Sequence, residues 1–125
     1  MIAMYMSFID SEDDREKFEI IYHEYRKRMV SVAYSILHNN EDAEDAVHET
    51  FIRIAKNMKA IDDPRSKKTS AYVITAAKNN AINLFNKIRN LLRSDVYTLF
   101  IINDNSDLAK IPNSKGYDIL YNPLD

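Results

Sequence analysis

Glycine occurs only once in this chain of 125 residues, and that scarcity restricts the folds that the chain can form. Tight β-hairpin turns and phosphate-cradling loops depend on glycine, so an all-β fold and a P-loop nucleotide site are both disfavoured. The chain has no cysteine, which excludes disulfides and a thiolate nucleophile and makes a reducing cytoplasm the natural compartment. At this length, one domain can bury a hydrophobic core. The composition therefore favours a single helical domain in the cytoplasm.

Nothing in the sequence indicates a membrane. No apolar run approaches the roughly 20 residues that a membrane-spanning helix requires. The opening segment, MIAMYMSFID, lacks the basic start and the long apolar centre of a signal peptide. We therefore expect no membrane partner.

A first long helix is predicted from about residue 12 to residue 37. Ser11 is a suitable N-cap, and the apolar residues that follow recur at alternating intervals of three and four. The expected inward face consists of Phe18, Ile21, Tyr22, Tyr25, Met29, Val32, Ala33, Ile36 and Leu37. His38, Asn39 and Asn40 interrupt the pattern, so this helix should pair antiparallel with the next one. Residues 1–11 form either a short strapping turn or a loose end.

The second predicted helix, residues 39–58, has one apolar face and a strongly acidic start. Asparagines at its beginning can cap it, and carboxylates in its first turns suit the positive end of the helix dipole. The expected inward residues are Ala43, Ala46, Val47, Thr50, Phe51, Ile54, Ala55 and Met58. The opposite face holds Asp42, Asp45, Glu49, Arg53 and Lys56, with His48 and Ile52 at its margin. Such a helix is expected to meet both a core and an outside partner.

A third helix is predicted after the loop of residues 60–69, capped by Thr69 or Ser70 and ending near Arg93. Its inward face should be Tyr72, Val73, Ala76, Ala77, Ala81, Leu84, Phe85 and Ile88. Four asparagines form a stripe on this helix, Asn79, Asn83, Asn86 and Asn90, at a cost of about 2 kcal/mol in helix propensity. Two explanations stay open: drift in an AT-rich genome, or an amide and lysine face that reads bases and phosphates. Beyond it, residues 96–102 either extend the helix or form a short strand.

The net charge of −2 hides a segregation of charge along the chain. Residues 1–63 carry 14 acids and 8 bases, residues 64–94 carry 7 bases and no acid, and residues 95–125 carry 5 acids and 2 bases. A basic segment between two acidic ones indicates a polyanion site. The alternative is an ordinary solvated helix face, although such faces usually mix both signs.

Catalytic and metal motifs are incomplete. His48-Glu49 begins a zincin-like HExxH sequence, but Ile52 stands where the second histidine is needed. Asp45-x-x-His48 has the spacing of half an iron site, but the chain has no second copy. A single glycine cannot form a GxSxG nucleophile motif. We therefore expect no enzyme activity, no metal and no cofactor.

Three ordered segments resemble region 2 of the extracytoplasmic-function group of bacterial sigma factors. These are FEIIYHEYRKRMVSVAYSIL, EDAEDAVHETFIRIAKNM and SAYVITAAKNNAINLFNKIRN, which together span roughly residues 15–93. The second segment is the most specific, since the family shows a DAEDxVQETF-like helix there. The resemblance implies an all-α domain of three to four helices over residues 1–94. Residues 95–125 would then be a linker or tail, without the helix-turn-helix of region 4.

The resemblance also implies a function in transcription initiation. The acidic helix would dock on the clamp helices of the RNA polymerase β′ subunit through Asp45, His48, Glu49, Ile52 and Arg53. The next two elements would recognise and melt the promoter −10 element and hold its non-template strand. Carried over position by position, the DNA-binding residues would be Arg65, Lys67, Lys68, Tyr72, Lys78, Asn79, Asn80, Asn83, Asn86 and Lys87.

The sequence departs from the family pattern at several of these positions. His48 replaces a glutamine, Tyr72 replaces a tryptophan, and Asn83 and Asn86 replace an aspartate and an arginine, which puts the usual promoter preference in doubt. The missing region 4 means either an excised domain or a protein that works with a separate region-4 partner. Two alternatives stay open: a sigma-like regulator that binds polymerase or an anti-sigma protein without reading DNA, and a helical dimerisation module.

Overall fold

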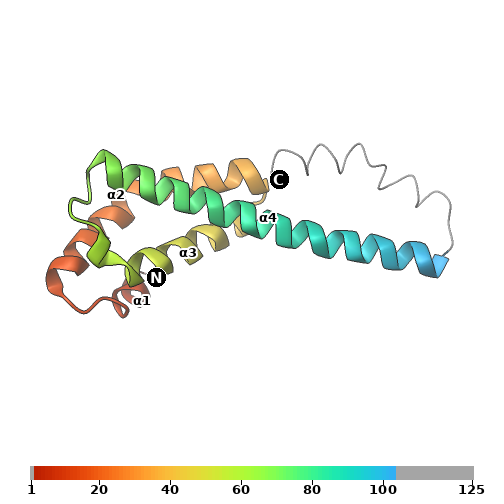
Figure 1. The fold of residues 1–125 in the computed structure, drawn as a ribbon, viewed down its shortest axis with the longest axis horizontal. Coiled ribbons are helices and arrows are strands. Elements are labelled where there is room, and N and C mark those ends of the chain that lie inside the picture. The colour runs from red at the N-terminus through yellow and green to blue at the C-terminus, as the bar shows by residue number, and fades with distance from the viewer. Residues whose placement is uncertain (1, 104–125) are drawn as a thin grey trace. The chain divides into compact units, whose positions relative to one another are not determined.

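The computed structural model describes the backbone of residues 2–103 and the side chains of residues 2–93, and this part of the chain consists of helices joined by short turns and loops. In order, the elements are α1 (Ile2–Met6), α2 (Glu12–Leu37), α3 (Asn40–Lys56), a short 3-10 helix η1 (Met58–Ala60) and α4 (Lys67–Asn103) (Figure 1). No strand occurs in residues 2–103. The chain divides into two compact units, Met1–Leu84 and a second that begins at Phe85. The prediction of an all-α fold is confirmed.

The helices α2 and α3 form the predicted antiparallel hairpin. Phe51, late in α3, packs on Phe18 and Tyr22, early in α2, with ring centroids 5.9 and 4.9 Å apart. At the other end, Glu44 near the start of α3 pairs with Arg26 farther along α2. Contacts that run in opposite order along the two helices require an antiparallel arrangement.

The caps predicted for these two helices are also confirmed. The side chain of Ser11 accepts a hydrogen bond from the backbone N–H of Asp14, and the side chain of Asn39 accepts one from Asp42. Between the helices, His38 closes α2 in the left-handed region, with φ of 54°, and its N–H donates to the carbonyl of Tyr34. This conformation ends α2 and lets Asn39 begin the next helix within two residues.

The core of the first unit follows the predicted faces of α2 and α3 closely. All eight residues assigned to the inward face of α3, from Ala43 to Met58, are buried. α2 contributes its fully buried side chains Phe18, Ile21 and Met29, and α4 contributes Val73, Ala77 and Ala81. Tyr72 differs from the expected inward position, since it is 38% exposed. Alanine predominates on the inward side of α4, which allows close approach of this helix to the core.

α4 begins earlier and ends later than the sequence suggested. The cap is Ser66, whose hydroxyl accepts a hydrogen bond from the N–H of Thr69; neither Thr69 nor Ser70 starts the helix, which begins at Lys67. At the other end the helix includes residues 96–102 and stops at Asn103, so the strand alternative for that segment is wrong. The rest of the expected tail, residues 104–125, lies outside the described residues.

The N-terminal segment is the strapping turn rather than the loose end. Its helix α1 is only five residues long, yet Tyr5 and the following Ile9 are buried in the core of the first unit. Arg15 of α2 donates to the carbonyl of Ile9, which fixes the return of the chain into α2.

Candidate functional site

The outward face of α3 presents the expected docking residues. Asp45, Glu49 and Arg53 are exposed, and His48 and Ile52 are half-buried at the edge of this face. Arg53 Nε lies 3.5 Å from Glu49 Oε1, one turn apart on the helix. Asp45 makes no ion pair among the residues that the structure describes and borders a shallow depression with Asn40, Glu41 and Glu44. This face can therefore offer carboxylates to a basic partner.

His48 is connected to the N-terminal segment. Its Nδ1 lies 2.7 Å from the hydroxyl of Tyr5, and the two rings lie 5.4 Å apart. One helical turn beyond Ile52, Lys56 lies over the ring of Phe8, with its Nζ 5.0 Å from the ring centroid. The segment around α1 thus runs along one edge of the α3 face. Sequence periodicity does not identify Tyr5, because a five-residue helix gives too few periods to reveal which side chain it buries.

A second missed contact ties the acidic start of α3 to α2. Arg26 donates to Glu44 Oε1 at 2.7 Å. Periodicity along α2 does not reveal this pair, since Arg26 and Glu44 are 18 positions apart. The pair neutralises one of the carboxylates of α3 and leaves Asp45 as the free carboxylate next to it.

The basic segment begins in a loop that its own hydrogen bonds hold in shape. The carboxylate of Asp63 accepts a hydrogen bond from the backbone N–H of Arg65. The backbone carbonyl of Asp63 accepts hydrogen bonds from the hydroxyls of Ser66 and Thr69. The hydroxyl of Tyr25, in the core, donates to the carbonyl of Pro64 at 2.9 Å, and burial raises the pKa of this tyrosine. These hydrogen bonds fix the conformation of the loop that leads into α4.

The cations at the start of this segment make few ion pairs with the rest of the described chain. Arg65 Nε lies 3.9 Å from Glu24 Oε1, which is a weak surface contact. Within the described part of the chain, Lys67, Lys68 and Lys78 are exposed and make no ion pair. Arg28 of α2 also reaches the start of α4, where it donates to the hydroxyl of Ser70 at 3.3 Å. Arg28 adds a cation that sequence spacing did not associate with this surface.

One row along the first half of α4 combines a cation, an aromatic ring and amides. Lys68, Tyr72, Asn79 and Asn83 are all exposed, at offsets of 0, 4, 11 and 15 residues. These offsets are close to whole multiples of the helical repeat of about 3.6 residues, so the four share one side of the helix. We call them the α4 row. Base stacking, phosphate contact and hydrogen bonding to base edges all require residues of these types.

Asn80 does not belong to that surface. It is only 8% exposed, and its Nδ2 donates to Thr50 Oγ1 of α3 at 2.7 Å. Thr50, itself fully buried, donates in turn to the carbonyl of Ala46. The prediction of a DNA contact is wrong for Asn80, because the amide satisfies a buried hydroxyl between two helices.

The remaining two expected DNA residues lie in the second unit. There Lys87 is exposed, Asn86 is half-buried, and Arg89 is buried. One of the seven bases counted in the sequence is therefore not on the surface.

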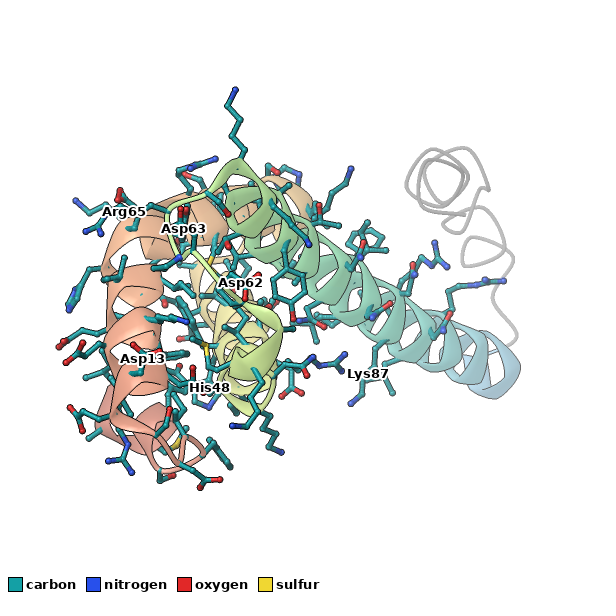
Figure 2. The ribbon with its side chains drawn as sticks, turned by 60° about the vertical axis from the view of Figure 1, so that its left-hand side comes forward. Asp13, His48, Asp62, Asp63, Arg65 and Lys87 are labelled. Atoms are coloured by element: carbon teal, nitrogen blue, oxygen red, sulfur yellow. The ribbon has the colours of Figure 1, made fainter. Side chains whose placement is uncertain are left out.

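The acidic and basic surfaces of the first unit are separate. Figure 2 shows His48 near the bottom of the bundle and Arg65, beside Asp63, near the top. Asp45 and Glu49 on α3 and Arg65 and Lys68 at the start of α4 are all exposed, so the rest of the described chain buries neither group.

Two further features bear on other classes of function. Within the described residues, no group of three or more histidine, aspartate or glutamate side chains is arranged to hold a metal ion. The helices of that part also lack the combination of length and apolar character needed to cross a membrane.

Comparison with known proteins identifies the family. The family model for sigma-70 region 2 matches residues 21–91, which include most of α2, all of α3 and α4 as far as Leu91. Searches of curated proteins and of solved structures find no match. The matched segment contains both surfaces described above, including every docking and DNA position expected from the sequence. The chain therefore belongs to the sigma-70 region 2 family, whose domains act in transcription initiation.

Proposed function

We propose that this domain docks on the clamp helices of the RNA polymerase β′ subunit through α3 and handles the promoter −10 element through the loop before α4 and the α4 row. The observation that carries the proposal is that exposed carboxylates of α3 and exposed cations at the start of α4 occur on one helical unit. Polymerase and promoter are cytoplasmic in bacteria, and we assign the domain to that compartment. In this role it catalyses no reaction of its own.

Electrostatic complementarity supports the docking half of the proposal. Asp45 and Glu49 are exposed carboxylates, and Arg53 lies 3.5 Å from Glu49 on the next turn of the helix. Ile52 adds a half-buried apolar side chain between them and Lys56. Charges arranged in this way steer and orient a basic partner more than they add raw affinity. Clamp helices with basic side chains are the partner that fits this face.

Residue chemistry supports the DNA half. Tyr72 is exposed in the middle of the basic surface and can stack on an unpaired base. Lys67, Lys68 and Lys78 have no competing ion pair in the described chain. Phosphates can therefore form ion pairs with these lysines without first breaking a contact within the protein. Asn79 and Asn83 can donate to and accept from base edges. Together these groups suit the displaced non-template strand of a −10 element.

The docking test uses charge reversal on α3. In the variant Asp45→Lys plus Glu49→Lys, we expect capture by isolated β′ clamp helices to weaken by at least about 100-fold, since two attractive carboxylates become repulsive. The matched control is Glu16→Lys plus Glu19→Lys, which makes the same charge change on exposed positions of α2. Capture should be measured alongside circular dichroism to verify helicity. Equal capture by both variants would refute the docking assignment.

A second candidate is a sigma-like regulator that binds polymerase, or an anti-sigma protein, without reading DNA. The observation in its favour is that the α4 row is uncharged beyond Lys68, and that Asn80 is withdrawn into the core. Anisotropy titrations of a −10-like single DNA strand, with and without core polymerase, distinguish the two candidate functions. Binding in the presence of polymerase supports the first proposal, and absence of binding in both supports the regulator. The first proposal includes two further points. The chain would be a member of the extracytoplasmic-function group, and it would work with a separate region-4 protein.

A further inference from the structure

The contact between Tyr5 and His48 places a buried tyrosine behind the docking face. Tyr5 is 2% exposed, and its ring packs on Phe18 and Phe51 with centroids 5.7 and 5.5 Å away. Its hydroxyl lies 2.7 Å from Nδ1 of His48, which is half-buried. The Tyr5 ring is therefore fixed by packing in the core, and its hydroxyl contacts the inner side of the His48 imidazole.

The direction of this hydrogen bond follows from what surrounds the hydroxyl. Among the described residues, His48 Nδ1 is the hydrogen-bond partner of Tyr5. Burial raises the pKa of Tyr5 to about 12, so the hydroxyl keeps its proton at neutral pH. If Nδ1 carried a proton and donated, the hydroxyl proton would be left without an acceptor, which is unfavourable for a buried group. Tyr5 therefore donates and Nδ1 accepts, which leaves the imidazole proton on Nε2.

We propose that Tyr5 is a positioning residue for polymerase docking: it holds His48 in the neutral Nε2–H tautomer, so that the α3 face presents one N–H donor between its carboxylates. The partner group would be an oxygen acceptor, a side-chain amide or carboxylate, on an otherwise basic helical surface. The inference rests on the docking function proposed above and assigns a role to a residue outside the segment that the family model matches.

Charged and polar groups of both long helices surround the pair. The groups are Tyr22 and Arg26 from α2 and Glu44 from α3, while Asp45 and Glu49 flank His48 along its own helix.

The test compares Tyr5→Phe with Tyr22→Phe. Tyr5→Phe keeps the ring in the core and removes only the donor; Tyr22, whose ring contacts both Tyr5 and Phe51, provides the matched control. Nitrogen-15 NMR of the imidazole should report the Nε2–H tautomer of His48 in the wild type and in the control, and a mixture of tautomers in Tyr5→Phe. Binding of isolated clamp helices at pH about 7.5 should weaken about three- to tenfold in Tyr5→Phe alone, as expected for one misplaced hydrogen bond.

A wild type that shows the Nδ1–H tautomer, or a Tyr5→Phe variant with unchanged tautomer and unchanged affinity, would overturn the inference. If Asp45→Lys plus Glu49→Lys also leaves affinity unchanged, the docking function itself fails, and the NMR result still decides whether Tyr5 sets the tautomer.

Discussion

The acidic face of α3 and the basic surface at the start of α4 are built differently. On α3, three of the polar groups already have partners, although Asp45 does not: Glu44 pairs with Arg26 at 2.7 Å, Glu49 lies 3.5 Å from Arg53, and His48 bonds to Tyr5. On the basic surface, the lysines make no ion pair in the described chain, and the contact of Arg65 with Glu24 is long. One surface is organised before binding, and the other has side chains that must become ordered when they bind.

This difference leads to different binding behaviour. A preorganised face loses little conformational entropy on association, so its affinity depends on the fit of a few groups. Flexible lysines that replace counterions on phosphates give binding that is strong at low salt and falls steeply as salt rises. We therefore expect docking to be sensitive to single contacts and DNA binding to be sensitive to ionic strength.

The largest expected effect concerns DNA. Lys68→Glu plus Lys78→Glu should weaken binding of a −10-like single strand by about 100-fold at low salt, because two phosphate contacts become repulsive. Fluorescence anisotropy over a salt series measures both affinity and salt slope. Lys56→Glu plus Lys59→Glu, at exposed positions outside the basic segment, is the control with the same charge change. An equal loss in the control would mean that net charge, not this surface, determines binding.

The next effect concerns stability. Asn80→Ala should lower the free energy of unfolding by about 1–3 kcal/mol, because the Thr50 hydroxyl loses its buried donor. Its exposed neighbour provides the comparison, since Asn79→Ala should change stability by less than about 0.5 kcal/mol. Urea titrations give both values. DNA affinity should respond in the opposite order, with Asn79→Ala weakening it and Asn80→Ala leaving it unchanged in the folded protein.

A smaller loss is expected at the start of α4. Ser66→Ala removes the N-cap of the helix and should cost about 1 kcal/mol of stability. Ser70→Ala, one turn into the helix, should cost less than about 0.5 kcal/mol, since it removes only a 3.3 Å surface contact with Arg28. Thermal melting of the two variants provides the measurement. If Ser70→Ala is the more destabilising change, Ser66 is not the cap.

The smallest effect concerns stability at high pH and distinguishes two tyrosines, Tyr5 behind the α3 face and Tyr25 behind the basic surface. Burial raises the pKa of Tyr5 from its ordinary value of 10 to about 12, and it also raises the pKa of Tyr25, which bonds to the carbonyl of Pro64. The folded-state pKa of Tyr5 lies above its unfolded value, so the protonated hydroxyl contributes to the free energy of unfolding. This contribution is fully present below pH 10 and is lost as the pH rises from 10 towards 12. Tyr5→Phe should therefore flatten the fall of the melting temperature above pH 10 more than Tyr25→Phe does. A steeper fall in Tyr5→Phe would contradict this order.

The sequence predicted α3 more fully than α4, and the reason is physical. In α3, all the large apolar residues except Ile52 lie on one side and nearly all the charges on the other, so periodicity alone assigns both faces. In α4, Asn79 and Asn80 are identical in type, and only Thr50, 30 positions away, determines which of them is buried. Ser66, Thr69 and Ser70 are equally suitable caps by residue type, and the geometry of the preceding loop decides between them.

The contact partners were the least predictable part of the site. Tyr5 and His48 are 43 positions apart, and Arg28 and Ser70 are 42 apart. Neither pair leaves a trace in local periodicity. The residues exposed on the two surfaces could be named from the sequence, whereas the side chains that support them could not.

The hydrogen bond between Thr50 and Asn80 has a consequence for the rotation of α4 about its own axis. Successive residues of a helix differ in direction by about 100°, so moving the bonded amide by a single position would turn the whole helix by that amount. Lys68, Tyr72, Asn79 and Asn83 would then face partly into the core. A bond between two uncharged side chains thus helps to fix the direction in which the α4 row points, and swapping the order of Ala81 and Asn80 would misdirect that row without altering composition or charge.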